Sequence, residues 1–454
     1  MKTKWIIITL CIVALVTAAI SIRLTLHPVA NAPADQTGPY KVGFVANTYY
    51  DNTRSDYAGG PRPITTYIWY PAAPDNDGNP LLTAVYPMKL LKLSGLNKTP
   101  DASSTDFEAY GIDPAYQEVA ASKDGPFPLV IFSPGQRADS LSYVHIGTRL
   151  ASHGFVVAIP TNFDDQLSAS GQPEFYPNDY AYLIGTYVER TRDLQYLMTR
   201  LVADSKKSGS LLSGAIRTGR IAVAGHSLGG LAALALAGGD ENTCTWTMVP
   251  AATNLPPESC VIIQPDPRIK AIVPIDATSY ALHYAELARI KIPSMLIGEE
   301  WSTWDSYKQN VETVIARPHA AIQGNPNYRV DVAYANHNSF SSSCAYIHIL
   351  YDKGSIDAQL RDAALPNMCP PESISAAEVE DLTSQYMIAF LKTVLVRETA
   401  YKGMLTTDYA LKNEPFIEFF ETEKGSPDTP DEEGHFSYFM HQPGTERAKA
   451  LKDQ

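Results

Sequence analysis

Apolar and polar positions along the chain follow two alternating patterns. Short, almost wholly apolar runs predict strands buried on both faces of a sheet, and runs that alternate predict strands with one exposed face. The predicted strands are Arg62–Ala72, Phe127–Gly135, Gly154–Pro160, Ile221–Ala224, Ile269–Asp276, Lys291–Gly298 and Tyr328–Tyr334. Stretches of helical periodicity lie between and after them, at Tyr143–His153, Asn178–Val202, Leu231–Ala237 and Ser375–Arg397. Strands that alternate with helices predict an α/β fold with a mostly parallel sheet and helices on both faces.

The longest predicted helix, Asn178–Val202, is amphipathic. Arg190, Arg192 and Asp193 fall together on its polar side.

One catalytic domain is predicted at residues 36–400, because large α/β enzymes often use a chain of this length in a single domain. Two segments interrupt the alternation. The first, near 81–121, has mixed composition and lies where a cap would cover a site; the second, near 240–265, resembles an insertion. Residues 401–454 are polar and acidic, and we expect them to form a C-terminal extension.

Residues 1–35 are interpreted as an export signal or N-terminal anchor followed by a linker. Lys2 and Lys4 precede an apolar run from Trp5 to Ile20, as in secretory signals. Cleavage after Ala18 or Ala19 would follow the small-residue rule, and an uncleaved anchor is the alternative. Both alternatives predict that most of the protein lies outside the cytoplasm, as a secreted or periplasmic protein.

Cysteine usage is consistent with export. Outside the predicted signal the chain has four cysteines, Cys244, Cys260, Cys344 and Cys369. An even number in an exported chain indicates disulfides, and the spacing fits neither a zinc site nor a C-x-x-C redox pair. Three pairings are formally allowed, and sequence proximity favours Cys244–Cys260 and Cys344–Cys369.

Charge and motifs exclude several classes of function. The formal net charge of −13 argues against nucleic-acid binding, which needs clustered Lys and Arg. The chain has no H-E-x-x-H motif, no P-loop and no G-x-G-x-x-G on a suitable βαβ unit. We therefore predict neither a metal nor a cofactor.

The segment Gly225–Gly229 has the sequence G-H-S-L-G between a predicted strand and a predicted helix. A sharp strand-to-helix turn strains the central residue and requires small residues two positions before and after it. Gly225 and Gly229 meet this requirement and would leave Ser227 exposed at the tip of the turn. Ser227 is therefore the predicted nucleophile, and a tight turn with no catalytic role is the alternative.

A serine nucleophile needs a histidine base and an acid that orients the histidine, and in α/β-hydrolases these follow in the order serine, acid, histidine. His337 comes directly after the last predicted strand, in a polar loop, and is the predicted base. Asp276 ends the strand after the nucleophile helix and is the favoured acid. The alternative acids lie one strand later, at Glu299, Glu300 and Asp305.

Two backbone amides are expected to stabilise the oxyanion of the reaction. Leu228 begins the helix after Ser227, where free amides and the helix dipole favour an anion. Pro134 in the loop Ser133-Pro134-Gly135 has no N–H, so Gln136 is the expected second donor.

Several of these segments resemble one known family. They are "PLVIFSPGQRADSLSYVHIGTRLASHGFVVAIP", "GHSLGG", "IVPIDAT" and "NHNSF". They look like the corresponding segments of the plasma-type platelet-activating factor acetylhydrolases, and they are similar to the related bacterial dienelactone-hydrolase-like proteins. The resemblance covers most of the chain from Arg62 to about Ala400. It implies the α/β-hydrolase fold, with Ser227 as nucleophile, Asp276 as acid and His337 as base.

The chain departs from this family at three places. Residues 240–265 form an insertion, Ser133 and Pro134 precede Gly135 where the plasma enzymes carry a histidine before the glycine, and Thr278 replaces an aromatic residue. True dienelactone hydrolases use a cysteine nucleophile, whereas this chain has a serine. These changes leave the triad intact and put a phospholipid substrate in question.

The sequence therefore predicts an exported serine esterase that works through an acyl-serine intermediate. The resemblance implies short or oxidised acyl chains, and platelet-activating-factor-like phospholipids as one substrate class. A cutinase- or polyester-hydrolase-like esterase is the alternative enzyme, and a non-catalytic binding protein is the alternative of another class. Contact with a membrane surface and the oligomeric state stay open.

The acyl pocket is expected to favour acetyl to butyryl groups. Its expected lining is Gln136, Leu228, Thr278, Tyr280 and the aromatic residues of Pro173–Leu183. A long chain buried against the Gln136 amide and the Thr278 hydroxyl would leave polar groups unsatisfied.

Overall fold

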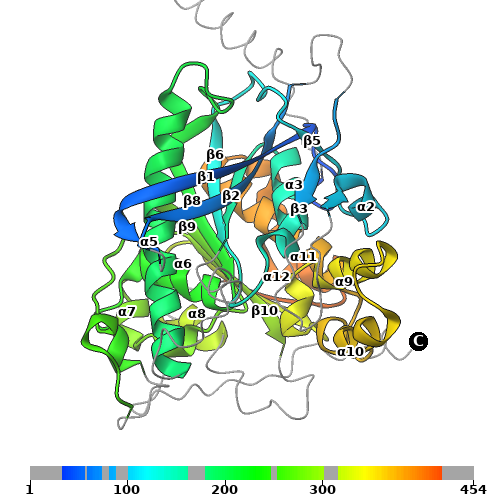
Figure 1. Ribbon diagram of the computed structural model, residues 1–454. Coiled ribbons are helices and arrows are strands. Elements are labelled where there is room, and N and C mark those ends of the chain that lie inside the picture. The colour runs from blue at the N-terminus through cyan, green and yellow to red at the C-terminus, as the bar shows by residue number, and fades with distance from the viewer. Residues whose placement is uncertain are drawn as a thin grey trace, which may run out of the picture.

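The computed structural model describes residues 33–56, 59–73, 81–87, 101–161, 179–246, 253–300 and 315–421. Within them, ten strands form one sheet (Figure 1). In chain order these strands are β1 (Val42–Ser55), β2 (Pro61–Pro71), β5 (Ala115–Gln117), β6 (Phe127–Ser133), β7 (Val156–Pro160), β8 (Ile216–His226), β9 (Ile269–Ile275), β10 (Ser294–Glu300), β11 (Asn327–Ala333) and β12 (Ile417–Phe420). Their order across the sheet is β12-β11-β10-β9-β8-β6-β7-β2-β1-β5.

The six central strands, from β11 to β7, are parallel to their neighbours. Antiparallel β12 closes one side, and antiparallel β2 and β1 continue the other. A parallel strand must be covered on both faces, which is why β6 and β7 are buried along their whole length. The predicted mostly parallel sheet is confirmed.

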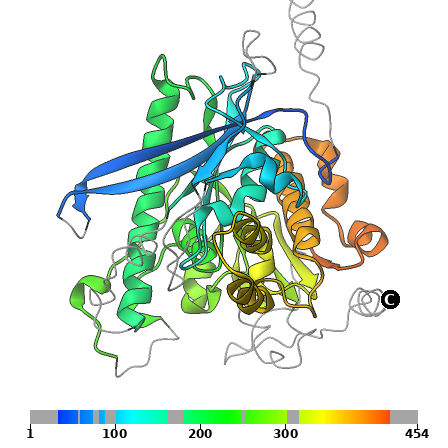
Figure 2. The same cartoon turned by 45° about the vertical axis from the view of Figure 1, so that its right-hand side comes forward.

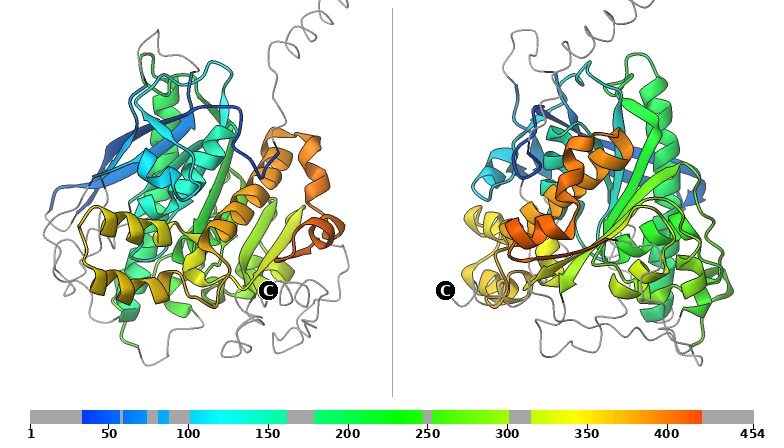
Figure 3. Two further views of the ribbon diagram at one scale, coloured as in Figure 1. Left: turned by 90° about the vertical axis from the view of Figure 1, so that its right-hand side faces the viewer. Right: turned by 180° about the vertical axis from the view of Figure 1, so that it is seen from behind.

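Helices cover both faces of the sheet (Figures 1 and 3). One face carries α5 (Asp179–Lys206), α6 (Leu228–Gly238), α7 (Tyr284–Leu287) and α8 (Arg317–Ala321). The other carries α3 (Val144–Ser152), α9 (Ser343–Asp352), α11 (Ala376–Leu391) and α12 (Thr407–Asn413), with α10 (Ala358–Met368) beside α9. The shorter helical turns are η1 (Ser140–Tyr143), η3 (Thr243–Thr245), η4 (Pro257–Ser259), η5 (Ser279–Ala281), η8 (His337–Phe340), the π-helical η9 (Lys392–Val396) and η10 (Thr399–Met404).

Helix α6, which follows the predicted nucleophile, has no polar side. Its residues from Leu228 to Leu236 are buried. They lie between the sheet and α5, because α5 packs over α6 and covers the side that would otherwise face water. The alanine- and leucine-rich sequence therefore fixes the helix firmly behind the turn at Ser227.

Two parts of the sheet differ from the sequence prediction. Strand β1 pairs with β2 as a long hairpin (Figure 2), and it was not predicted because exposed polar residues interrupt its apolar ones. Strand β12 adds to β11, so Tyr328–Tyr334 does not contain the last strand. The C-terminal extension predicted from residue 401 therefore begins too early, since residues up to 420 belong to the fold. Residues 422–454 lie outside the described residues.

Arg190 and Asp193 lie on the polar side of α5 but are buried, and only Arg192 of the three polar residues is exposed. Asp193 binds the guanidinium groups of Arg54 and Arg62 from the β1–β2 hairpin. Each buried charge has charged or polar partners, which offsets the cost of removing it from water.

The segment near 81–121 forms β3 (Val85–Pro87), β4 (Asp101–Ser103), α2 (Ser104–Glu108) and β5. Tyr86 packs its ring against Phe44 and Trp69 of the first two strands, and the buried Phe107 packs on Tyr86. This segment is therefore part of the core at the β1 side of the sheet.

The predicted cysteine pairing is confirmed: Cys244 is bonded to Cys260, and Cys344 to Cys369. The second disulfide joins the start of α9 to the end of α10. Such bonds indicate an oxidising, extracellular compartment. No helix of the described residues is long and apolar enough to cross a membrane, and the predicted signal at residues 1–32 lies outside them.

The disulfides give a stability prediction. Replacing either cysteine pair by serine should lower the free energy of unfolding by about 3 kcal/mol, because each bond restricts the unfolded chain over a loop of moderate length. Urea unfolding of the double variants measures this loss. Mass spectrometry of the unreduced digest should find both cross-linked peptides, and four alkylatable thiols in the folded protein would contradict the pairing.

Candidate active site

Ser227 lies between the end of β8 and the start of α6, at the carboxyl edge of the parallel strands. Its backbone has φ 55° and ψ −121°, a conformation that side-chain-bearing residues rarely adopt. Its amide donates to the carbonyl of Ile275 at 2.9 Å, and its carbonyl accepts from Leu231 at 3.1 Å. These bonds hold the serine at the tip of a strained strand-to-helix turn, the conformation predicted from the glycine spacing.

The two glycines that flank Ser227 are required by close backbone contacts. A Cβ atom at Gly229 would lie 2.0 Å from the carbonyl oxygen of Ser133, and one at Gly225 would lie 2.5 Å from the backbone of Gly229. No side chain fits at either position. The turn therefore presses directly against the end of β6.

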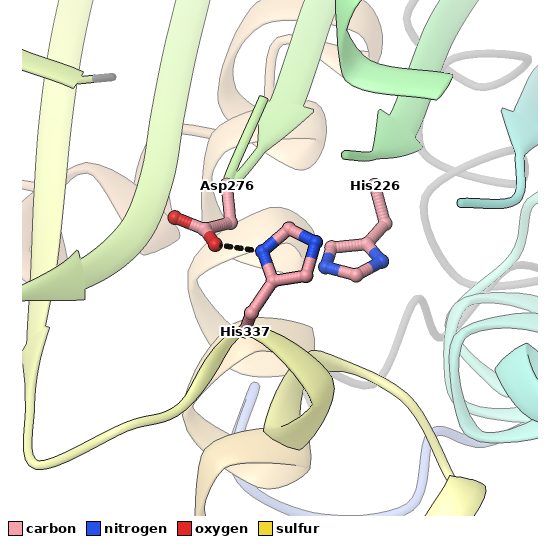
Figure 4. Close-up of side chains that lie close together, drawn as sticks. All are labelled: His226, Asp276 and His337. Atoms are coloured by element: carbon pink, nitrogen blue, oxygen red, sulfur yellow. Dashed lines mark hydrogen bonds and ion pairs between the residues drawn. The ribbon is translucent and has the colours of Figure 1, made fainter. Parts of the chain in front are cut away.

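Asp276 and His337 are brought together from different parts of the chain. Asp276 directly follows β9 and is buried, with φ 39°, and its amide donates to the carbonyl of Ile297 at 2.7 Å. His337 is the first residue of η8, after β11. Its Nδ1 is hydrogen-bonded to a carboxylate oxygen of Asp276, as Figure 4 shows. This is the acid–histidine pair that the sequence predicted.

The pKa of His337 reflects two opposing effects. Burial lowers the pKa of the imidazole, while the charge and hydrogen bond of Asp276 raise it, and the net shift is upward from the ordinary value. The carboxylate therefore stabilises the imidazolium form at this position.

Glu299, one of the alternative acids, lies beside Asp276 at the end of β10. Burial, together with the negative charge of Asp276, raises its pKa to about 9, so its side chain is neutral at neutral pH. Its backbone amide donates to Asp276 Oδ1 at 3.4 Å. Asp276 is the carboxylate bonded to the His337 ring, whereas Glu299 is hydrogen-bonded to the backbone N–H of His337. The side chain of Glu300 and all of Asp305 lie outside the described residues.

His226, the residue before the serine, connects the pair to the neighbouring loop. Its ring lies against that of His337, with centroids 4.5 Å apart (Figure 4). Its Nδ1 is 2.8 Å from the hydroxyl of Tyr143, which accepts the amide N–H of Gly135 at 3.0 Å. Burial, and then the nearby His337, lower the pKa of His226 well below its ordinary value. His226 is therefore a neutral ring packed behind His337.

His226, Asp276 and His337 also have the composition of a metal site, since each can place one ligand atom within 4.8 Å of the others. In this structure Asp276 binds His337, and Tyr143 binds His226. These bonds hold the three side chains as an acid–base pair with a supporting ring.

Arg190, on the polar side of α5, is bound beneath the loop after β6. Its guanidinium donates to the carbonyl of Pro134, to that of Gly135 at 3.4 Å and to the hydroxyl of Ser133 at 3.2 Å. The carbonyls of the loop therefore point into the protein, toward a permanent charge. Gln136, the next residue, lines the cavity at Ser227.

The cavity beside Ser227 has a volume of about 460 Å³, a size typical of small-molecule sites. Its walls are residues 135–139, Ser142, Tyr143, His226, Ser227, His337, Asn338, Ser341, Ser343, Tyr346, Ile347, Leu360, Ala363, Ala364, Asn367 and Met368. Within the described part of the chain, no hydrogen bond joins the Ser227 hydroxyl to His337, although both face this space; such bonds often form only with substrate bound.

Much of this lining was not predicted. Gln136 is present, whereas Leu228 turns its side chain into the core and Thr278 lies outside the walls. No described residue of 81–121 lines the cavity, and residues 88–100 of that segment lie outside the described part of the chain; α9 and α10 form much of the wall. The side chain of Tyr280 and residues 173–178 lie outside the described residues.

Comparison with known proteins supports the fold and the resemblance. The family model "Platelet-activating factor acetylhydrolase, isoform II" matches residues 34–175, a region that includes β6 and the loop before Gln136. No protein of curated function matches the chain. Among solved structures, a ferulic acid esterase from Streptomyces cinnamoneus is similar, with a TM-score of 0.55 and 19% sequence identity. The similarity covers 87% of this chain and 99% of the esterase.

The glycine contacts at the turn give a test of its geometry. Gly229→Ala should destabilise the protein by about 1–3 kcal/mol, because the new methyl group collides with the Ser133 carbonyl, which cannot move freely. Gly219→Ala is the matched control, since a Cβ atom at Gly219, on the strand β8 that precedes the turn, has no neighbour within 4 Å. Equal melting temperatures for the two variants would show that the backbones do not meet at Gly229.

Proposed function

From the family-model match at residues 34–175 and the similar fold of a solved esterase, we propose that this chain is an α/β-hydrolase of the platelet-activating-factor-acetylhydrolase-like type, and that it is an exported serine hydrolase of carboxylic esters. The observation that carries the proposal is Ser227 at the tip of a strained turn, in the same cavity as the Asp276–His337 pair. Each of the three comes from a different strand end of the parallel sheet, where active sites of this architecture form.

In the first half-reaction Ser227 attacks the ester carbonyl, and His337 Nε2 takes its proton. Asp276 binds Nδ1, which fixes the tautomer that leaves Nε2 free to accept and stabilises the imidazolium that forms. The carbonyl carbon gains a bond to Ser227 Oγ and loses its bond to the alcohol oxygen. His337 then returns the proton to that oxygen.

The negative charge on the carbonyl oxygen is stabilised by the amides of Leu228 and Gln136. Leu228 is the first residue of α6, and its amide has no acceptor within the helix. Arg190 binds the carbonyls of the loop before Gln136 and so holds this loop in one conformation. A fixed donor costs no reorganisation when the charge develops.

In the second half-reaction a water molecule replaces the alcohol. His337 takes a proton from the water as its oxygen bonds to the acyl carbon, and then returns that proton to Ser227 Oγ as the acyl–Oγ bond breaks, which restores Ser227 and releases the acid. All proton transfers use one imidazole, so every catalytic group needed comes from the chain itself.

For the acyl group we propose a short chain, because the polar Gln136 borders the space next to Ser227. Esters of platelet-activating-factor type and polyester-like substrates are the two candidate classes, and the fold is compatible with both. A non-catalytic binding role is the remaining alternative, and it would leave Ser227 unreactive.

Covalent labelling tests the proposed nucleophile. A fluorophosphonate probe should modify Ser227 in the folded protein, and Ser227→Ala should lower kcat by about 10⁴-fold or more on p-nitrophenyl acetate. Peptide mapping by mass spectrometry locates the label. A folded sample that takes up no label at Ser227 would favour a binding protein over an enzyme.

The identity of the acid is tested by two matched amide substitutions. Asp276→Asn should lower kcat by about 10⁴-fold, because it disfavours the required tautomer. The same change removes the charge that raises the pKa of His337, so the rising limb of kcat/KM should move to lower pH. Glu299→Gln should retain activity, since the glutamate is already neutral.

The pH dependence of the free energy of unfolding tests separately whether Glu299 is neutral in the folded protein. Between its ordinary pKa of 4.5 and its folded value of about 9, the unfolded chain has lost a proton that the folded chain keeps. The free energy of unfolding should therefore fall with rising pH in this window, and less steeply in Glu299→Gln. An active Asp276→Asn together with an inactive Glu299→Gln would assign the acid to Glu299.

A further inference from the structure

One side of α10 faces the candidate active site. Leu360, Ala363, Ala364, Asn367 and Met368 line the cavity, and their spacing of three and four residues places them on one helix face. None of the helix's residues is fully buried, and Leu360, Ala364 and Met368 only partly pack on the core. A mainly apolar helix face is thus presented to the cavity.

Helix α10 lies on the His337 side of this cavity. The side chain of Asn338, the residue after His337, donates to the carbonyl of Asn367 at 2.9 Å. The Cys344–Cys369 disulfide joins the end of α10 to α9, which begins shortly after η8. Figure 2 shows α9 and α10 side by side as a hairpin. The loop with Gly135 and Gln136, which carries one proposed oxyanion donor, forms a separate part of the wall.

Proton transfer determines which part of an ester reaches this side. His337 Nδ1 is held by Asp276, so Nε2 must protonate the oxygen of the departing alcohol. That oxygen therefore lies next to the His337 ring at the moment of bond cleavage. Whatever is attached to it extends past η8 and onto α10, while the acyl group remains at Ser227.

We propose that the inward face of α10 binds the alcohol part of the ester, and that Leu360, Ala364 and Met368 select alcohols with an alkyl or aryl body. This inference rests on the proposed function. Ser341 and Ser343, a few residues after His337, line the same cavity as the apolar residues of α10. The alanines at two of the five positions leave the room that an alcohol several carbons long requires.

Two ester series separate the alcohol side from the acyl side. The first keeps the acetyl group and varies the alcohol from methanol to octanol; the second keeps p-nitrophenol and varies the acid from acetate to octanoate. Ala364→Trp fills the proposed alcohol site. In this variant kcat/KM should fall about tenfold more for octyl acetate than for methyl acetate, because the new ring prevents a few methylene groups of the octyl chain from being buried. Dependence on acyl length should be unchanged.

The matched control is Gln359→Trp, which adds a similar ring to an exposed position on the same helix and should leave both series unchanged. Deacylation gives a second readout. All acetate esters form the same acetyl-enzyme, so its hydrolysis rate should be the same in Ala364→Trp and in the unaltered protein.

A changed acyl-length dependence in Ala364→Trp, or an equal loss on every ester, would overturn the proposal. If Ala364→Trp does not fold, Leu360→Ala and Met368→Ala test the same wall, because each enlarges the cavity. Each should raise the rate on acetates of branched alcohols relative to the rate on methyl acetate. No change in those rates would also overturn the proposal. Failure of the proposed function is distinguishable, because Ser227 would then take up no fluorophosphonate and no ester would be cleaved.

Discussion

The site depends on a contact between backbones, where the turn from β8 to α6 meets the end of β6. Gly225 and Gly229 have no side chains, and the carbonyl of Ser133 occupies the space that a Cβ atom would need. Close packing of this kind leaves one position for the serine and one for the loop that follows Ser133. Arg190 then fixes that loop from below, since its charge attracts the carbonyls of Pro134 and Gly135. The proposed nucleophile and the loop proposed to supply an oxyanion donor are thus positioned by the same few atoms.

Burial divides two pairs of chemically similar groups into different ionisation states. Asp276 and Glu299 end adjacent strands, yet the high pKa of Glu299 leaves one negative charge between them at neutral pH. The rings of His337 and His226 lie against one another at a tilt, but Asp276 stabilises the charged form of His337 alone. Glu299 and His226 are therefore the two neutral neighbours of the Asp276–His337 pair. Two charged carboxylates, or two charged imidazoles, would repel at these separations.

The features predicted correctly from the sequence are those determined by local requirements. The glycines around Ser227 are needed by one turn, and that turn is found. Strand order along the chain placed Asp276 and His337 at the same sheet edge, and the structure brings them into contact. Cysteines near one another in sequence are bonded because each pair closes a local loop.

The features that were missed depend on partners distant in sequence. Arg190 and Asp193 look like exposed helix residues, and only the loop after β6 and the β1–β2 hairpin reveal why they are buried. Strand β12 is four residues long and is recognisable as a strand only by its pairing with β11. The cavity wall on α10 was missed for the same reason: the sequence of a mixed helix does not say what it covers.

The α9–α10 hairpin is a single continuous piece of the chain, residues 343–369, closed on itself by the Cys344–Cys369 bond. It follows His337 but contains none of the groups proposed for proton transfer or oxyanion stabilisation. Much of the cavity wall is therefore formed by this one continuous segment, while the groups proposed for the reaction lie in other parts of the chain. Insertions, deletions or recombination confined to residues 343–369 can therefore change the shape of the pocket, in evolution or in protein engineering, and leave the groups proposed for bond cleavage in place.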